Sequence, residues 1–391
     1  MDPEKLRAWW AARQGLDGSL QRHSAEDVLS RAGWSRSVGG AGPYLTLFAR
    51  AGLSRVAIDD AVAKAKIHEL PAARGCTYVV PEAEYAVALT VGQQFSPESE
   101  MRLVRKFGVT DKEIDKLRAA ILRAVESAPL DTDDIRKAVG ATARGLGPEA
   151  AKKGVTTTLP VALGLMQSAG EIRRVPTNGR LDQQRYQYVA WKQNPLTKWK
   201  KTREETFTEL ARRYFMWIGP ARISEFQWFS GLGVKAAKDA VEPLRLADLG
   251  DGLLLPPRDR DAFEHFRIPA KPHYVLVSSL DSIMQLRRDV TSLLAPEDQS
   301  RDFTKGKKTL LDLSDHGIFD RGRLIGYWQF DPTDGIIVWN SFIRPDADLR
   351  DAVKRTEAFV REDLGDARAY SLDSPKSRAP RIAEMKKAGI P

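Results

Sequence analysis

Side chains that donate hydrogen bonds, both cationic and neutral, are concentrated in one stretch of the chain, residues 172–191. Arginine and glutamine dominate it, with one aspartate: Arg173, Arg174, Arg180, Arg185, Gln183, Gln184, Gln187 and Asp182. Guanidinium and carboxamide groups donate hydrogen bonds to phosphate oxygens and to base edges. We therefore expect six of them to contact DNA: Arg173, Arg174, Arg180, Gln183, Gln184 and Arg185. The alternative is a solvated hairpin with no ligand.

A second group lies just upstream, where a helix is expected over residues 156–169. Two lysines and three threonines precede or begin it: Lys152, Lys153, Thr156, Thr157 and Thr158. Helix N-termini carry free N–H groups and bind phosphate readily. We expect these residues to hold the DNA backbone, with simple helix capping as the alternative.

A third group interleaves aromatic and cationic side chains around Trp199, between Lys198 and Lys200. Such stretches stack on bases and hold the backbone of nucleic acids. The alternative is a linker whose tryptophans pack on neighbouring domains.

The sequence lacks the residue patterns of a metal site and of a nucleotide-binding site. The five histidines are scattered and the chain has a single cysteine, Cys76, so no metal site is expected. Gly39 to Gly42 lack the Lys and Ser/Thr of a phosphate-binding loop, so no nucleotide cofactor is expected either.

Bulk properties favour a globular protein with an acidic partner. The 391 residues are enough for two to four domains, and the net charge of +9 favours polyanions. No apolar run approaches the roughly 20 residues of a membrane span, and the charged N-terminus does not read as a secretory signal. We expect a cytoplasmic, nucleoid-associated monomer.

The elements that must position these side chains are clearest over residues 101–200. A capping box from Thr110 to Glu113 starts an amphipathic helix that Pro129 ends. A short helix stopped by Gly140 and the helix at 156–169 follow. The turn Asn178-Gly179 then joins two strands, which is a strong hairpin signal. Three helices and a hairpin predict a winged helix.

Two flanking stretches follow the same order. Residues 201–262 predict helices at 204–218, 225–229 and 234–241, followed by a hairpin around Asp251-Gly252. Residues 1–100 predict four helices and a strand at 77–81, in a less regular pattern.

From residue 263 to residue 391 the pattern changes to short strands, at 274–277, 317–319, 323–330 and 335–342, with turns between them. A helix at 346–364 and a basic tail from Lys376 to Lys387 follow. The predicted fold class is α+β: three tandem winged-helix domains followed by a small C-terminal antiparallel β-barrel.

Three segments resemble one family, the bacterial winged-helix DNA glycosylases that excise alkylated bases and unhook interstrand crosslinks. They are Gly42-Pro43-Tyr44-Leu45-Thr46-Leu47-Phe48-Ala49-Arg50, Ala73-Arg74-Gly75-Cys76-Thr77-Tyr78-Val79-Val80-Pro81, and Gly219 to Leu232. The segment Asp320 to Trp328 resembles a strand pair of the family's barrel. The resemblance implies a C-shaped clamp around duplex DNA.

The family's catalytic motif is missing. Its members carry Gln-x-Gln or Gln-x-Asp about a dozen residues before Pro-Tyr-Leu, where the polar pair positions water and stabilises an oxocarbenium-like sugar. The matching stretch, Ser30 to Ser37, contains no Gln, Asp or Glu, and counting back from Pro43 places Ala32 and Trp34 at the two positions.

Asp281 is the substitute catalytic carboxylate that the sequence offers, because it follows a strand that resembles a family strand ending in Phe-Asp. The alternative is an aspartate that caps a helix or turn. The resemblance also places Arg74 on the inner face of the clamp, where an ion pair is the alternative. Arg36 is expected to contact DNA. Trp34 is expected to fill the core or a pocket, with a wedge between bases as the alternative.

Three functions therefore remain open. One is a divergent monofunctional glycosylase that hydrolyses the N-glycosidic bond of alkylated purines. The second is a non-catalytic winged-helix protein that binds DNA or regulates transcription. The third is a protein-interaction scaffold that keeps the fold without a DNA-binding surface.

Overall fold

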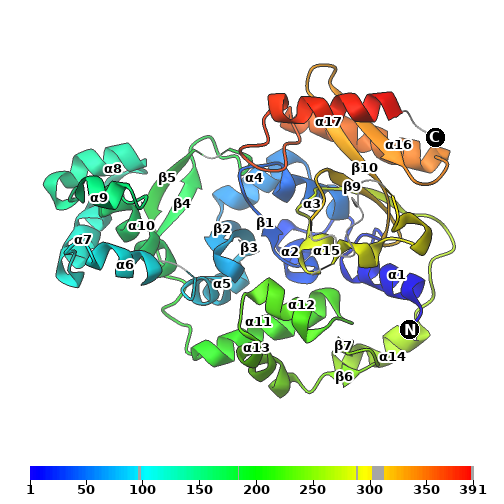
Figure 1. The fold of residues 1–391 in the computed structure, drawn as a ribbon, viewed down its shortest axis with the longest axis horizontal. Helices are drawn as coiled ribbons and strands as arrows, with labels where there is room; N and C mark the ends of the chain where they lie inside the picture. Colours follow the sequence, from blue (N-terminus) through cyan, green and yellow to red (C-terminus); the bar gives the residue numbers. More distant parts are fainter. Residues whose placement is uncertain (96–97, 184, 288, 302–311, 389–391) are drawn as a thin grey trace.

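The computed structural model describes residues 1–391 except 96–97, 184, 288, 302–311 and 389–391. Over these residues the fold is mixed α+β, with many short helices and four small antiparallel sheets. Figure 1 shows residues 25–92 at the centre, with residues 98–190 at one end and the C-terminal sheet and residues 203–241 on two other sides. None of the helices in the described ranges has both the length and the apolar character that a membrane span needs.

The N-terminal part is more regular than its sequence indicates. Its elements are α1 (Pro3–Arg13), α2 (Ala25–Ala32), β1 (Ser35–Arg36), α3 (Gly42–Ala51), α4 (Arg55–Ala63), β2 (Ile67–Pro71), η1 (Ala73–Gly75), β3 (Thr77–Pro81) and α5 (Tyr85–Gly92). Ser24 and Ser54 cap α2 and α4 with their side chains. The strands form a sheet in the order β1-β3-β2.

The middle part follows the predicted order closely. It contains α6 (Glu98–Arg105), α7 (Asp111–Ser127), α8 (Thr132–Val139), α9 (Gly147–Ala151), α10 (Leu159–Ser168), β4 (Ile172–Pro176) and β5 (Tyr186–Ala190). Only half of the expected capping box forms: Thr110 accepts from the N–H of Glu113, whose carboxylate instead pairs with Arg144 at 2.7 Å.

The third part forms α11 (Arg203–Ile218), α12 (Ile223–Ser230), α13 (Val234–Val241), β6 (Ala247–Asp248) and β7 (Leu254–Leu255). A complete capping box of Thr202 and Glu205 starts α11. Helix α12 begins two residues before the expected start at residue 225, with Arg222 as its N-cap residue.

The C-terminal part corrects two expectations. Its elements are α14 (Arg260–His265), β8 (Tyr274–Val277), α15 (Ser282–Gln285), β9 (His316–Asp320), β10 (Arg323–Asp331), β11 (Ile336–Ser341), α16 (Ala347–Phe359) and α17 (Pro375–Ala388). Within the described residues the strands form an open sheet, β11-β10-β9-β8, and no closed barrel. Four strands leave two edges, and α16 and α17 pack on this sheet.

The expected basic tail is the helix α17. Arg378 within it is fully buried and pairs with Asp366 at 2.6 Å, so this positive charge forms an internal ion pair.

The hydrophobic cores show which parts are joined. One core combines Trp9 of α1, Tyr78 of β3, Phe215 of α11, Phe229 of α12 and Val277 of β8. The buried residues of two further cores lie wholly between residues 101 and 172. The middle part therefore has hydrophobic cores of its own, whereas the N-terminal, third and C-terminal parts contribute to one common core.

Candidate nucleic-acid interface and pocket

A pocket of about 390 Å³ opens where the β4–β5 hairpin meets the N-terminal sheet. The side chains that line this central pocket are Arg36, Ser37, Val38, Cys76, Thr77, Arg174 and Tyr186. Backbone pairing sets one wall, because the N–H of Ser37 donates to the carbonyl of Thr77 at 3.0 Å. Arg174 crosses from the hairpin: it donates to Thr77 Oγ1 at 3.3 Å and lies 4.7 Å from the Tyr186 ring centroid.

A cluster of two arginines and a glutamine adjoins this pocket. Arg36 Nη1 and Arg74 Nη2 both donate to Gln285 Oε1, at 3.3 and 3.4 Å. The Arg74 guanidinium also lies 3.9 Å from the ring centroid of Trp228 on α12. A left-handed backbone at Arg74, φ 57°, turns the chain in η1 at this point. Three parts of the chain thus meet in one cationic cluster.

A buried carboxylate, Glu69 of β2, lies behind the pocket wall and is 3% exposed. Its Oε1 accepts a hydrogen bond from the Ser37 hydroxyl, and no partner meets hydrogen-bond geometry at Oε2 in the described chain. Burial raises the pKa of Glu69, opposed by the Ser37 hydrogen bond, the Arg174 charge and the nearby Tyr186 hydroxyl. The pKa of Tyr186 is raised in turn, by burial and then by the charge of Glu69.

Glu69 is not among the residues that the sequence predicts for the site. It lies in a strand, Ile67–Pro71, that is buried almost throughout. A carboxylate in such a strand is the signal that would have drawn attention to it, since buried Glu is rare without a partner.

The predicted Arg173 lies in the junction between the hairpin and β2. Its guanidinium is 5.3 Å from the Trp191 ring centroid, and burial lowers its pKa. The neighbouring His68 is fully buried, and this burial, together with the charges of Arg173 and Arg174, lowers its pKa to about 3. His68 is therefore neutral at physiological pH.

The tip of the hairpin is docked on the rest of the protein. Arg180 pairs with Asp182 and donates to the carbonyl of Leu364 at 2.9 Å. The buried Leu181 donates its N–H to the Tyr44 hydroxyl at 2.9 Å. Among the other predicted contacts, Gln183 is half-buried, Arg185 is exposed and Gln184 lies outside the described residues. The structure brings Arg174, but not Arg180, to the pocket.

The upstream group does not converge on the pocket. Lys152 and Lys153 are exposed beside α9, at the outer end of the molecule in Figure 1, and Lys152 pairs with Glu149 at 2.6 Å. Thr156 is exposed, but the hydroxyls of Thr157 and Thr158 are buried and have no partner in the described chain.

Lys198 and Lys200 are exposed, whereas Trp199 is half-buried and donates to Thr206 Oγ1 at 3.0 Å. The tryptophan therefore packs against its neighbour, as the alternative interpretation has it.

Asp281 is fully buried in an ion pair. Its two oxygens accept from Arg50 at 2.7 and 2.8 Å, and Oδ1 also accepts the N–H of Ile283 as the cap of α15. It does not line the central pocket. This placement favours the capping role of Asp281 over the catalytic one.

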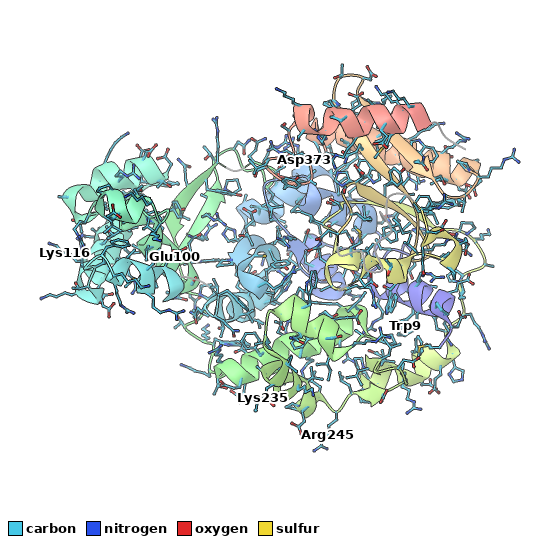
Figure 2. All side chains as sticks on the ribbon, in the orientation of Figure 1. Trp9, Glu100, Lys116, Lys235, Arg245 and Asp373 are labelled. Carbon is cyan, nitrogen blue, oxygen red and sulfur yellow. The ribbon has the colours of Figure 1, made fainter. Side chains whose placement is uncertain are left out.

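The positions counted for the missing motif are also in the core. Ala32 is fully buried, and Trp34 is 1% exposed and donates to Glu84 Oε2 at 2.6 Å. The side chains of this stretch that reach the pocket are Arg36 and Ser37. Figure 2 shows Lys116 at the outer end of the middle part and Lys235 on α13.

Two comparisons with known proteins place the chain in a family and a fold. The family model of the DNA glycosylase AlkZ-like proteins matches residues 37–356. The chain belongs to the AlkZ-like DNA glycosylase family. A solved structure, the Streptomyces sahachiroi DNA glycosylase AlkZ, is similar with a TM-score of 0.68 and 18% identity, over 94% of this chain and 98% of that one. At this identity the likeness shows a common fold. No curated protein sequence matches the chain.

Proposed function

We propose that this chain binds double-stranded DNA at the central pocket and hydrolyses the N-glycosidic bond of an alkylated purine. One observation carries the proposal: the guanidinium groups of Arg36, Arg74 and Arg174 converge around a pocket that has a buried carboxylate behind it. Membership of a DNA glycosylase family supports the same reaction.

The proposed binding mode follows from the charges. Arginines hold phosphates and release counterions, while the pocket volume of about 390 Å³ lies within the range of small-ligand sites. An alkylated purine leaves as a neutral base, so its departure needs little acid catalysis. The site must instead orient water and support positive charge on the sugar.

The three helix-and-hairpin stretches, residues 1–100, 101–200 and 201–262, are proposed to be winged-helix domains. Each pairs a short extra strand or bridge with its hairpin, as the fold requires: β1 with β3, Leu130 with Tyr188, and Ala221 with Leu254. Residues 263–391 form the proposed fourth domain. The protein would act on damaged duplex DNA as a monomer, with exposed lysines such as Lys153, Lys198 and Lys200 adding phosphate contacts.

A second function is favoured by the burial of Ala32 and Trp34, which leaves the counted motif positions without a carboxylate or carboxamide. In that case the chain binds DNA and does no chemistry.

Release of N7-methylguanine from a methylated duplex, measured together with duplex binding at several salt concentrations, tests the proposal. Release by the wild type supports the glycosylase. Binding without release favours the second function, and the absence of both overturns the proposed DNA interface.

A further inference from the structure

We propose that Ser37 and Glu69 form a proton relay that activates the hydrolytic water in the central pocket. This inference rests on the proposed function and names the groups that perform its chemistry. It is carried by a pocket-lining hydroxyl whose proton is already directed at a buried carboxylate.

The geometry assigns a distinct role to each atom. Because the Ser37 hydroxyl donates to Glu69 Oε1, its lone pairs are available to accept a proton from a molecule in the pocket. Glu69 itself does not line the pocket, so it is a positioning residue that acts through Ser37. This arrangement repeats the general logic of a hydroxyl activated by an adjacent base.

The proposed step balances without any cofactor. The water oxygen forms a bond to C1′ of the sugar as the bond from C1′ to the purine nitrogen breaks. The electron pair of the broken bond leaves with the alkylated base and neutralises it. One water proton passes to Ser37 Oγ while the Ser37 proton passes to Glu69. Solvent removes that proton after release.

The surroundings of Glu69 set its ionisation. The polar and charged groups that influence it are Ser37, Arg174 and Tyr186, and all three stabilise the carboxylate against the larger effect of burial, so its pKa stays raised. Only the ionised carboxylate accepts the proton. The rate of base release is therefore expected to rise with pH through this raised pKa and then to level off.

Glu69→Gln tests the relay, because glutamine keeps the shape and can accept the Ser37 hydrogen bond but cannot accept its proton. Single-turnover release of N7-methylguanine is expected to fall by about 10²-fold or more, the range for general bases. Duplex affinity and the thermal midpoint are expected to stay close to the wild-type values. Ser37→Ala is expected to slow release as well and to remove the pH dependence.

The matched control is Glu84→Gln. Glu84 is also a buried glutamate with a raised pKa, but it pairs with Arg213 and Trp34 away from the pocket. Its release rate and pH profile are expected to match those of the wild type.

The outcomes separate the two proposals. If wild-type protein releases no base, both the proposed function and the relay are wrong. If wild-type protein releases base and Glu69→Gln does so at the same rate with the same pH profile, only the relay is wrong. Loss of release with retained affinity and folding supports it.

Discussion

Replacing Asp281 with asparagine should lower the free energy of unfolding and leave base release per folded molecule unchanged. Arg50 and Asp281 are each 0% exposed at the side chain, so solvent does not screen the pair. The substitution removes the negative charge opposite a guanidinium that has no access to water. Breaking a buried pair by changing one partner costs about 3–5 kcal/mol.

Several contacts set the size of the effect. Besides the two bonds from Arg50, Asp281 Oδ2 accepts from Thr46 at 3.0 Å and Oδ1 accepts the N–H of Ile283 at 3.0 Å. Asparagine keeps one acceptor oxygen, so the helix cap partly survives and the loss falls toward the lower end, about 3 kcal/mol.

Urea unfolding followed by tryptophan fluorescence measures this loss, and base release per folded molecule measures the chemistry. Asp60→Asn is the control, because the Asp60–Lys64 pair is more than half exposed and such pairs contribute at most about 1 kcal/mol. If Asp281→Asn unfolds like the wild type but loses base release, the structural assignment is refuted and Asp281 becomes the catalytic carboxylate.

Three further predictions address binding, pH and backbone geometry. Arg174→Ala should lower duplex affinity and reduce the slope of log affinity against log salt concentration by about one phosphate contact. Lys116→Ala, at the outer end in Figure 2, should leave this slope unchanged in a gel-shift titration. Equal slopes for both variants would contradict the interface. His68 has a folded-state pKa of about 3, below its usual 6.5, so the unfolded chain binds more protons between these values and stability is lost as pH falls through that window. His68→Leu should therefore flatten the pH dependence of the unfolding free energy between pH 6.5 and 4, and an unaltered slope would speak against a neutral buried imidazole. Gly322→Ala should lower the thermal midpoint, because φ is +79° and a Cβ there would collide with the carbonyl oxygen of Arg7; a midpoint equal to that of the wild type would show that this turn relaxes freely.

Local patterns predicted the elements well where local physics decides them. The helix that Thr110 caps, the Asn178-Gly179 hairpin and the α11 helix all form as their spacing indicates. These features depend on capping, turn chemistry and periodicity, which act over a few residues.

The features that the local sequence patterns did not predict depend on tertiary packing. An alternating apolar pattern does not distinguish a closed barrel from an open sheet covered by α16 and α17. Arg378 in the expected tail is likewise buried and forms an ion pair with Asp366, so its charge does not add to a basic surface.

In the site, too, the local sequence indicates residue types, whereas tertiary packing decides which residues meet. The sequence predicted Arg36, Arg74 and Arg174 as DNA contacts, and these stay predictions. It contains nothing that brings Gln285 to Arg36 across 249 residues. Glu69 was missed because its significance depends on the Ser37 hydroxyl and on a hairpin from another part of the chain.

The most direct test of the account is a structure of the protein bound to duplex DNA that contains a pyrrolidine abasic analogue, whose cationic ring nitrogen mimics the charged sugar. We predict that the analogue is turned out of the duplex into the central pocket, beside Ser37, with phosphates on Arg36 and Arg174. A duplex bound on another face, or an analogue that stays stacked away from this pocket, would contradict it.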